Sequence, residues 1–242
     1  MLQGLIFDMA EVLYDATAWR RWLLQLLSRL GVQADYRTFY QAWDRDYLIE
    51  VQCGRREFNE AFKAFLLAAG LTSGQVDEIE AACRIRRLEF ERDARPFPCV
   101  AAALRRLTDD GLSLVVSTNA ACPATDLQAM LDRWGIGGRF AAVWSSFDLQ
   151  AAMPASVCFQ SALDSLKLSA RRAAYIGHDS RSLKGAAQFG LKTIAINHAA
   201  DARADLFVGG FGELPDAIKT WRTTLLSPAK PVVYPDRWTQ AA

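Results

Sequence analysis

The sequence predicts an α/β fold in which a doubly wound, mainly parallel sheet of five strands is interrupted by an inserted set of helices. One short apolar run lies near the start of the chain, and a long stretch without a convincing strand follows it. After Pro96 and Pro98, short apolar runs alternate with helix-like stretches. Such alternation is typical of parallel strands joined by helices that cover both faces of a sheet.

The first predicted element is a strand over residues 3–7, which ends directly before Asp8. Four helix-like stretches follow it, over 16–30, 36–50, 55–69 and 74–93. In the first stretch, apolar side chains recur three and four residues apart and so share one face. They are Trp19, Trp22, Leu23, Leu26, Leu27 and Leu30. We expect residues 16–95 to form a helical cap domain whose core holds these tryptophans and Trp43, in preference to a ligand box made of their rings.

The rest of the chain supplies the remaining strands, over 112–116, 140–144, 173–176 and 193–196. Helix-like stretches accompany them over 99–108, 123–134, 155–166, 181–189 and 212–225. The simplest arrangement places all five strands in one core domain made of residues 1–15 and 96–226. The tail 227–242 contains three prolines and no periodicity, so we expect it to be extended.

The tail also carries residue types that are favoured at interface hot spots, namely Tyr234, Arg237 and Trp238. They suggest contact with a protein partner or a second copy of the chain. Packing of the tail on its own domain, or disorder of the tail, is the alternative.

Composition excludes several classes of protein. The 28 Lys and Arg residues balance 27 Asp and Glu residues, which leaves a net charge of +1 and predicts no binding to nucleic acid or to an anionic membrane. The apolar runs are shorter than the roughly 20 residues of a membrane span, and no basic leader precedes Asp8. The five cysteines form no CxxC pair, which favours reduced thiols over a disulfide framework or a zinc site. We therefore expect a cytoplasmic protein.

Polar side chains stand where three of the predicted strands end. They are Asp8 after the first strand, Ser117, Thr118 and Asn119 after the second, and His178 and Asp179 after the fourth. Ligands of open α/β sheets bind beyond the carboxyl ends of the strands, so these groups are expected to surround one small polar ligand. Asp8 is the candidate nucleophile or metal ligand, and a helix-capping or turn aspartate is the alternative reading of that residue alone.

Four segments in order along the chain resemble the four motifs of the haloacid dehalogenase superfamily. Residues 5–15 (LIFDMAEVLYD) are similar to its first motif, and residues 114–120 (LVVSTNA) resemble its second. Residues 153–163 (MPASVCFQSAL) are similar to the third, and residues 175–196 resemble the fourth. The resemblance implies a Rossmann-like core. A helical insertion directly after the first motif is what this family calls a C1 cap.

The resemblance also implies a mechanism. In the family the first aspartate, here Asp8, attacks phosphorus or carbon and forms a covalent aspartyl intermediate. A second aspartate two residues later protonates the leaving group in the phosphatases. Mg²⁺ is held by carboxylates of the first and fourth motifs, which suggests Asp8 and Asp179 here. The Ser117–Asn119 segment and a lysine of the third motif would steady the phosphoryl oxygens.

Three positions depart from the family's pattern. Ala10 stands at the position of the acid, Met153 at that of the lysine, and Ser182 at that of the second acidic residue of the fourth motif. Asp179 is also closer to Gly185 than the usual first aspartate of that motif. The sequence therefore predicts a degraded phosphatase site, with weak or absent Mg²⁺ binding. The protein would be inactive or severely impaired and would act as a binding or regulatory protein for a small anion or phosphorylated ligand.

The alternative is an active hydrolase that uses Asp8. Glu11 or His178 would then substitute for the missing acid, or Lys184 for the missing positive charge, although each also fits an ordinary structural position. Dehalogenation would be compatible with Ala10, because halide leaves without a proton and no acid is needed at that position. That reaction still needs a lysine at position 153 and a basic halide pocket, for which the candidates are Arg20, Arg21 and Arg45. A solvated helix face is the alternative place for these arginines.

Overall fold

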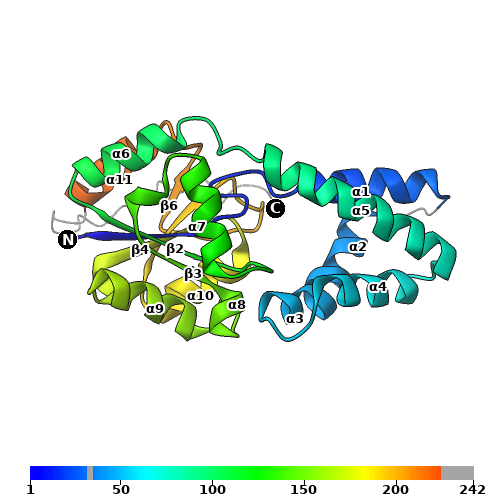
Figure 1. Cartoon of the computed structure of the whole chain (residues 1–242). Helices are drawn as coiled ribbons and strands as arrows, with labels where there is room; N and C mark the ends of the chain where they lie inside the picture. The colour runs from blue at the N-terminus through cyan, green and yellow to red at the C-terminus, as the bar shows by residue number, and fades with distance from the viewer. Residues whose placement is uncertain (32–34, 225–242) are drawn as a thin grey trace, which may run out of the picture.

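The computed structural model describes residues 1–31 and 35–224, and it contains one sheet of six parallel strands (Figure 1). The strands are β1 (Gly4–Phe7), β2 (Ser113–Thr118), β3 (Phe140–Ser145), β4 (Ala173–Gly177), β5 (Lys192–Ile196) and β6 (Leu206–Val208). Their order across the sheet is β3-β2-β1-β4-β5-β6, and all neighbours pair in parallel. The doubly wound α/β prediction is confirmed.

The predicted count of five strands is wrong by one, because the sequence analysis missed β6. This strand has only three residues, and it pairs with β5 at the edge of the sheet through Ile194–Leu206 and Ile196–Val208. All three residues are apolar, but the run is shorter than those of the other strands and is directly followed by two glycines. In the structure its central side chain, Phe207, is 49% exposed, as befits an edge strand.

Two hydrophobic clusters hold the helices against the two faces of the sheet, because successive strand side chains point in opposite directions. Phe7 faces the cluster that includes α6 (Val100–Asp109), α7 (Ala124–Arg133) and α11 (Leu214–Thr224). Its neighbour Ile6 faces the cluster that includes α9 (Ser156–Leu166) and α10 (Ser180–Phe189). Shorter helices lie at α8 (Ser146–Leu149) and, as 3₁₀ turns, at Gly137–Arg139 and Ala170–Arg172.

Between β1 and α6 the described chain is mainly helical. The helices are α1 (Ala18–Arg29), α2 (Tyr36–Trp43), a π-helical turn (Asp44–Leu48), α3 (Ile49–Gln52), α4 (Phe58–Ala68) and α5 (Ser73–Asp93). We call residues 18–93 the helical segment. It has its own hydrophobic cluster, whose buried members all come from residues 23–83 and include Trp43, with Trp19 and Trp22 packed against it. These three rings therefore belong to the packing of the helices, as expected from their spacing.

The helical segment lies beside the part of the chain that contains the sheet (Figure 1). α3 approaches α8, where the Ser146 hydroxyl donates a hydrogen bond to the Gln52 carbonyl (2.7 Å). The proposed division into a core of residues 1–15 and 96–226 and a cap of 16–95 stays a prediction. The tail 227–242, with Tyr234, Arg237 and Trp238, lies outside the described residues. None of the described helices combines the length and apolarity needed to cross a bilayer.

Candidate active site

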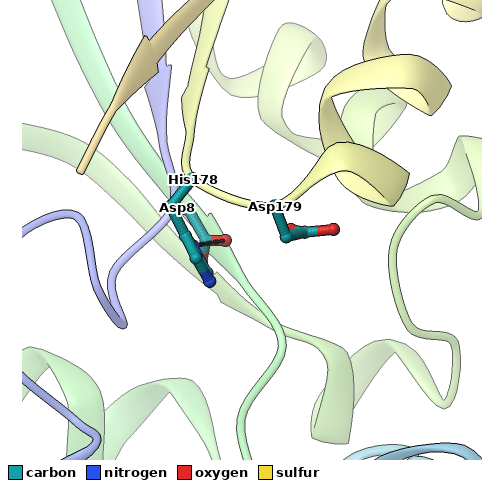
Figure 2. Close-up of side chains that lie close together, drawn as sticks. All are labelled: Asp8, His178 and Asp179. Atoms are coloured by element: carbon teal, nitrogen blue, oxygen red, sulfur yellow. Dashed lines mark ion pairs between the residues drawn. The ribbon is translucent and has the colours of Figure 1, made fainter. Parts of the chain in front are cut away.

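The strand order places the predicted site residues together at the carboxyl ends of the central strands. β1 lies between β2 and β4, so the residues that follow these three strands are neighbours. Asp8 directly follows β1, is 5% exposed, and donates its backbone N–H to the Ile176 carbonyl (2.9 Å). Thr118 ends β2, and His178 follows β4 and points toward Asp8 (Figure 2). The prediction that these strand ends share one site agrees with this geometry.

The carboxylate of Asp8 is held by three hydrogen-bond donors. Its Oδ1 accepts hydrogen bonds from the Thr118 hydroxyl (2.6 Å) and from the Met9 backbone N–H (2.8 Å). Its Oδ2 accepts one from the Tyr175 hydroxyl (3.1 Å). These contacts fix the carboxylate plane, which is what a nucleophile or a metal ligand at this position requires.

Tyr175 is a site residue that sequence reasoning missed. It lies within β4, is fully buried, and packs its ring against Phe159. Burial and the nearby carboxylates of Asp8 and Asp179 raise the pKa of Tyr175 well above its ordinary value. The hydroxyl therefore stays protonated and donates a hydrogen bond to Asp8. The hydroxyl of a buried tyrosine normally has a hydrogen-bond partner, so a tyrosine in a buried strand could have been considered as a donor to a nearby site residue.

Burial raises the pKa of Asp8 above its ordinary value of 3.8, although His178 and the hydrogen bond from Thr118 oppose the shift. We therefore expect Asp8→Asn to unfold at a higher denaturant concentration than the parent protein at neutral pH. The unfolded chain releases the Asp8 proton near pH 3.8, whereas the folded protein holds it to higher pH. The parent thus loses stability relative to the variant as pH rises through this window, and the gap stays constant above it.

Denaturant midpoints of both proteins between pH 3.5 and 8, measured with a chelator present, check this expectation. Asp15→Asn is the control, because the pKa of Asp15 is shifted in the direction opposite to that of Asp8. Partial burial acts against it, but hydrogen bonds from Thr17 and Arg21 lower the pKa of Asp15 overall. Asp15→Asn should therefore lower stability at neutral pH. A gap between the Asp8→Asn variant and the parent that is independent of pH would contradict the burial argument.

The remaining predicted residues of the second motif take different places. The Ser117 hydroxyl donates to the Cys158 carbonyl (3.0 Å), so it faces α9 and not Asp8. The Asn119 side chain accepts from the Met153 N–H (2.7 Å) and donates to the Met153 carbonyl (3.4 Å). Of the two hydroxyls, only that of Thr118 bonds to Asp8, and Asn119 positions the backbone of residue 153.

The three altered positions are apolar or neutral in the structure as well. The Met153 side chain is 2% exposed and packs in the cluster that contains Ile6 and Phe159. Ala10 pairs through its backbone with Tyr14, and its methyl group has no proton to transfer. Ser182 is buried, and its N–H donates to Oδ1 of Asp179 (2.8 Å), which caps the N-terminus of α10.

Two of the side chains considered as substitutes, Glu11 and Lys184, have a structural partner or face solvent. Glu11 Oε1 accepts a hydrogen bond from the Ala16 N–H (2.9 Å), and burial raises the pKa of Glu11. Lys184 is exposed on α10. The three arginines of the predicted halide pocket are each paired with an aspartate: Arg20 with Asp44 (2.8 Å), Arg21 with Asp15 (2.6 Å) and Arg45 with Asp46 (2.6 Å). Their pairing favours the solvated helix face.

Within the described part of the chain, Asp8, His178 and Asp179 form a group that can hold a divalent cation, since each offers a ligand atom within 4.8 Å of the others (Figure 2). Two carboxylates suffice for Mg²⁺, which completes its shell with water and phosphate oxygens, so Asp8 and Asp179 fit the ion that the family commonly uses. When bound, such an ion supplies positive charge to a phosphoryl oxygen.

The comparison with models of protein families shows to which family the chain belongs. A model of haloacid dehalogenase-like hydrolases matches residues 2–190. The chain belongs to this family. The match covers the whole helical segment and the strand ends that carry Asp8, Thr118 and His178, so the predicted membership of the family is confirmed. A search of the curated proteins gives no match for the chain.

Solved structures of the haloacid dehalogenase-like fold include both dehalogenases and phosphatases. A 2-haloacid dehalogenase from Pseudomonas syringae pv. tomato DC3000 is 23% identical, with a TM-score of 0.59 over 91% of this chain and 100% of that one. L-2-haloacid dehalogenase from Xanthobacter autotrophicus is 18% identical (TM-score 0.62, 90% and 99% covered). A predicted phosphoglycolate phosphatase from Haemophilus somnus 129pt is 16% identical (TM-score 0.64, 89% and 97%). At these identities the likeness shows the fold, and the residues of the site must decide the reaction.

Proposed function

We propose that this haloacid dehalogenase-like protein is an inactive or severely impaired phosphatase that acts as a binding or regulatory protein. The observation that carries the proposal is the environment of Met153. The family's lysine would stand there, but the Met153 side chain is 2% exposed within an apolar cluster. A thioether in such surroundings supplies no positive charge to a phosphoryl oxygen.

Ala10 removes a second contribution. Loss of a positioned general acid typically costs about 10²–10⁴ in rate. Loss of one electrostatic donor costs about 10²–10³ more. If the two effects add, they amount to roughly 5–9 kcal/mol of barrier. Since Glu11 is engaged by the Ala16 N–H and Lys184 faces solvent, neither replaces these groups in the resting protein.

The surroundings of Asp8 still support binding of a small anion or phosphorylated ligand. The Thr118 hydroxyl is in place, and a divalent cation between Asp8 and Asp179 would offset their negative charge. Directly after β3, the Ser146 hydroxyl accepts a hydrogen bond from the Ala120 N–H (3.1 Å) and donates one to the Gln52 carbonyl of the helical segment. This link supports a cap role for the helical segment, whose position would respond to a ligand at the strand ends.

The test is an assay of the full chain with Mg²⁺ and a panel of phosphate esters, beside Asp8→Asn. We expect no turnover that depends on Asp8, while titration calorimetry with inorganic phosphate and Mg²⁺ detects binding. Turnover at ordinary enzyme rates, about 1–10³ s⁻¹, that disappears in Asp8→Asn would overturn the proposal.

The alternative function is an active hydrolase, and the hydrogen-bonded Asp8 favours it. Thr118, Met9 and Tyr175 hold the carboxylate in one orientation, as a nucleophile needs. A phosphatase fits this alternative better than a dehalogenase, because the three arginines considered for a halide pocket pair with aspartates, whereas the missing lysine at position 153 counts against both reactions. Release of halide from a 2-haloacid, lost in Asp8→Asn, would favour the dehalogenase instead.

A further inference from the structure

One ring nitrogen beside Asp8 has no partner. His178 Nδ1 is buried and makes no hydrogen bond within the described residues, although 27% of the side chain as a whole is exposed. It lies 3.9 Å from Asp8 Oδ2, which is too far for a hydrogen bond. A buried polar atom without a partner is costly, so its position calls for a ligand between the two side chains.

The neighbouring carboxylates are already oriented as metal ligands are in proteins. Asp8 Oδ2 accepts from the Tyr175 hydroxyl, and Asp8 Oδ1 from Thr118. Asp179 Oδ1 accepts from the Ser182 N–H, which leaves its second oxygen available. Hydrogen bonds of this kind fix ligand carboxylates and are a regular part of metal sites. The backbone carbonyl of His178 accepts from the Ala199 N–H (3.0 Å), which fixes the main chain from which the imidazole extends.

We infer that His178 is a third protein ligand of the cation at Asp8 and Asp179, and that it makes the site prefer Mn²⁺, Co²⁺ or Zn²⁺ over Mg²⁺. Transition ions gain more from an imidazole nitrogen than Mg²⁺ does, and among the three named ions the gain is smallest for Mn²⁺. Mg²⁺ favours an all-oxygen shell and gains little from His178. Three protein ligands leave further coordination positions open for water or an anion.

This inference goes beyond the proposed function, since it concerns the ion that the resting protein binds and holds whether or not the site turns over. An imidazolium–carboxylate pair without a metal is the competing explanation for the closeness of His178 and Asp8. That explanation predicts no selective metal binding, which makes the two distinguishable without any substrate.

The experiment is titration calorimetry of the metal-free full chain with MnCl₂ and, separately, with MgCl₂. The key variant is His178→Asp, which replaces the nitrogen donor with oxygen, and the matched control is His198→Ala. His198 is the only other histidine of the chain and packs on Phe207. We expect one Mn²⁺ site in the parent and in His198→Ala. In His178→Asp, the preference for Mn²⁺ over Mg²⁺ should fall at least about tenfold.

A second readout protects the test against a variant that fails to fold. In the parent protein, Zn²⁺, which is diamagnetic, should shift the NMR signals of the His178 imidazole and leave those of the His198 imidazole close to their metal-free positions. Equal binding of the two ions by the parent, an unchanged preference in His178→Asp, or His178 imidazole signals that Zn²⁺ leaves unshifted would each overturn the inference. None of these outcomes depends on phosphatase activity, so the proposed function is tested separately.

Discussion

The double variant Ala10→Asp, Met153→Lys is expected to hydrolyse phosphate esters in the presence of Mg²⁺, at rates at least about 10²–10⁴ above those of the parent. The carboxyl group introduced at position 10 would stand two residues after Asp8, where it can protonate the leaving oxygen. The ammonium group introduced at position 153 would add a positive charge next to a backbone that Asn119 already holds. Initial rates of phosphate release measure the gain.

The choice of substrate makes this experiment sharper. An alkyl phosphate has a poor leaving group that needs protonation, whereas an aryl phosphate with an acidic phenol does not. The gain from the carboxyl group at position 10 should therefore be much larger with the alkyl ester. Ala10→Asn is the matched control, because it adds similar bulk without an acidic proton to give.

The outcome depends on Asp8 and on folding. Introducing Asp8→Asn into the double variant should abolish the gain, because the nucleophile is lost. The lysine introduced at position 153 enters an apolar cluster, so circular dichroism must first show that the variant is folded. A folded double variant that hydrolyses phosphate esters no faster than the parent would mean that the residues at positions 10 and 153 are not what limits hydrolysis at this site.

Much of the fold follows from the sequence because its strands are buried on both faces. β1 and β4 are buried throughout, and a continuous apolar run is the signal that such strands leave. β6 left only a weak signal, since its apolar run has three residues. Pairing of β6 is decided by the tertiary position of β5.

The site was predictable to the extent that strand ends carry it. Asp8, Thr118 and His178 each follow or end a strand, and parallel strands bring such residues together. Sequence alone did not separate Thr118 from Ser117, because successive side chains on a strand point to opposite faces and the register was not known. Nor did it find Tyr175, whose hydroxyl reaches Asp8 only because β4 pairs directly with β1.

Replacing Trp43 by alanine is expected to destabilise the helical segment by about 3–5 kcal/mol, as is typical for a large buried aromatic side chain. Trp43 is 1% exposed. Its ring contacts the rings of Tyr47, Phe58, Phe62 and Phe65. The buried members of this cluster all come from residues 23–83, so the loss should be confined to the helices. Amide hydrogen exchange should show faster exchange in α1–α5 and unchanged protection in β1–β5.

Trp43→Phe is the control for this prediction. The indole Nε1 of Trp43 is buried and has no hydrogen-bond partner in the described part of the chain. Phenylalanine keeps a ring in the cluster and removes this unsatisfied donor, so its cost should be well below that of alanine. Loss of protection in the strands as well would contradict the separation of the two cores. Because Thr118 and Tyr175, which hold Asp8, lie on β2 and β4, Mn²⁺ binding at Asp8 should survive in Trp43→Ala.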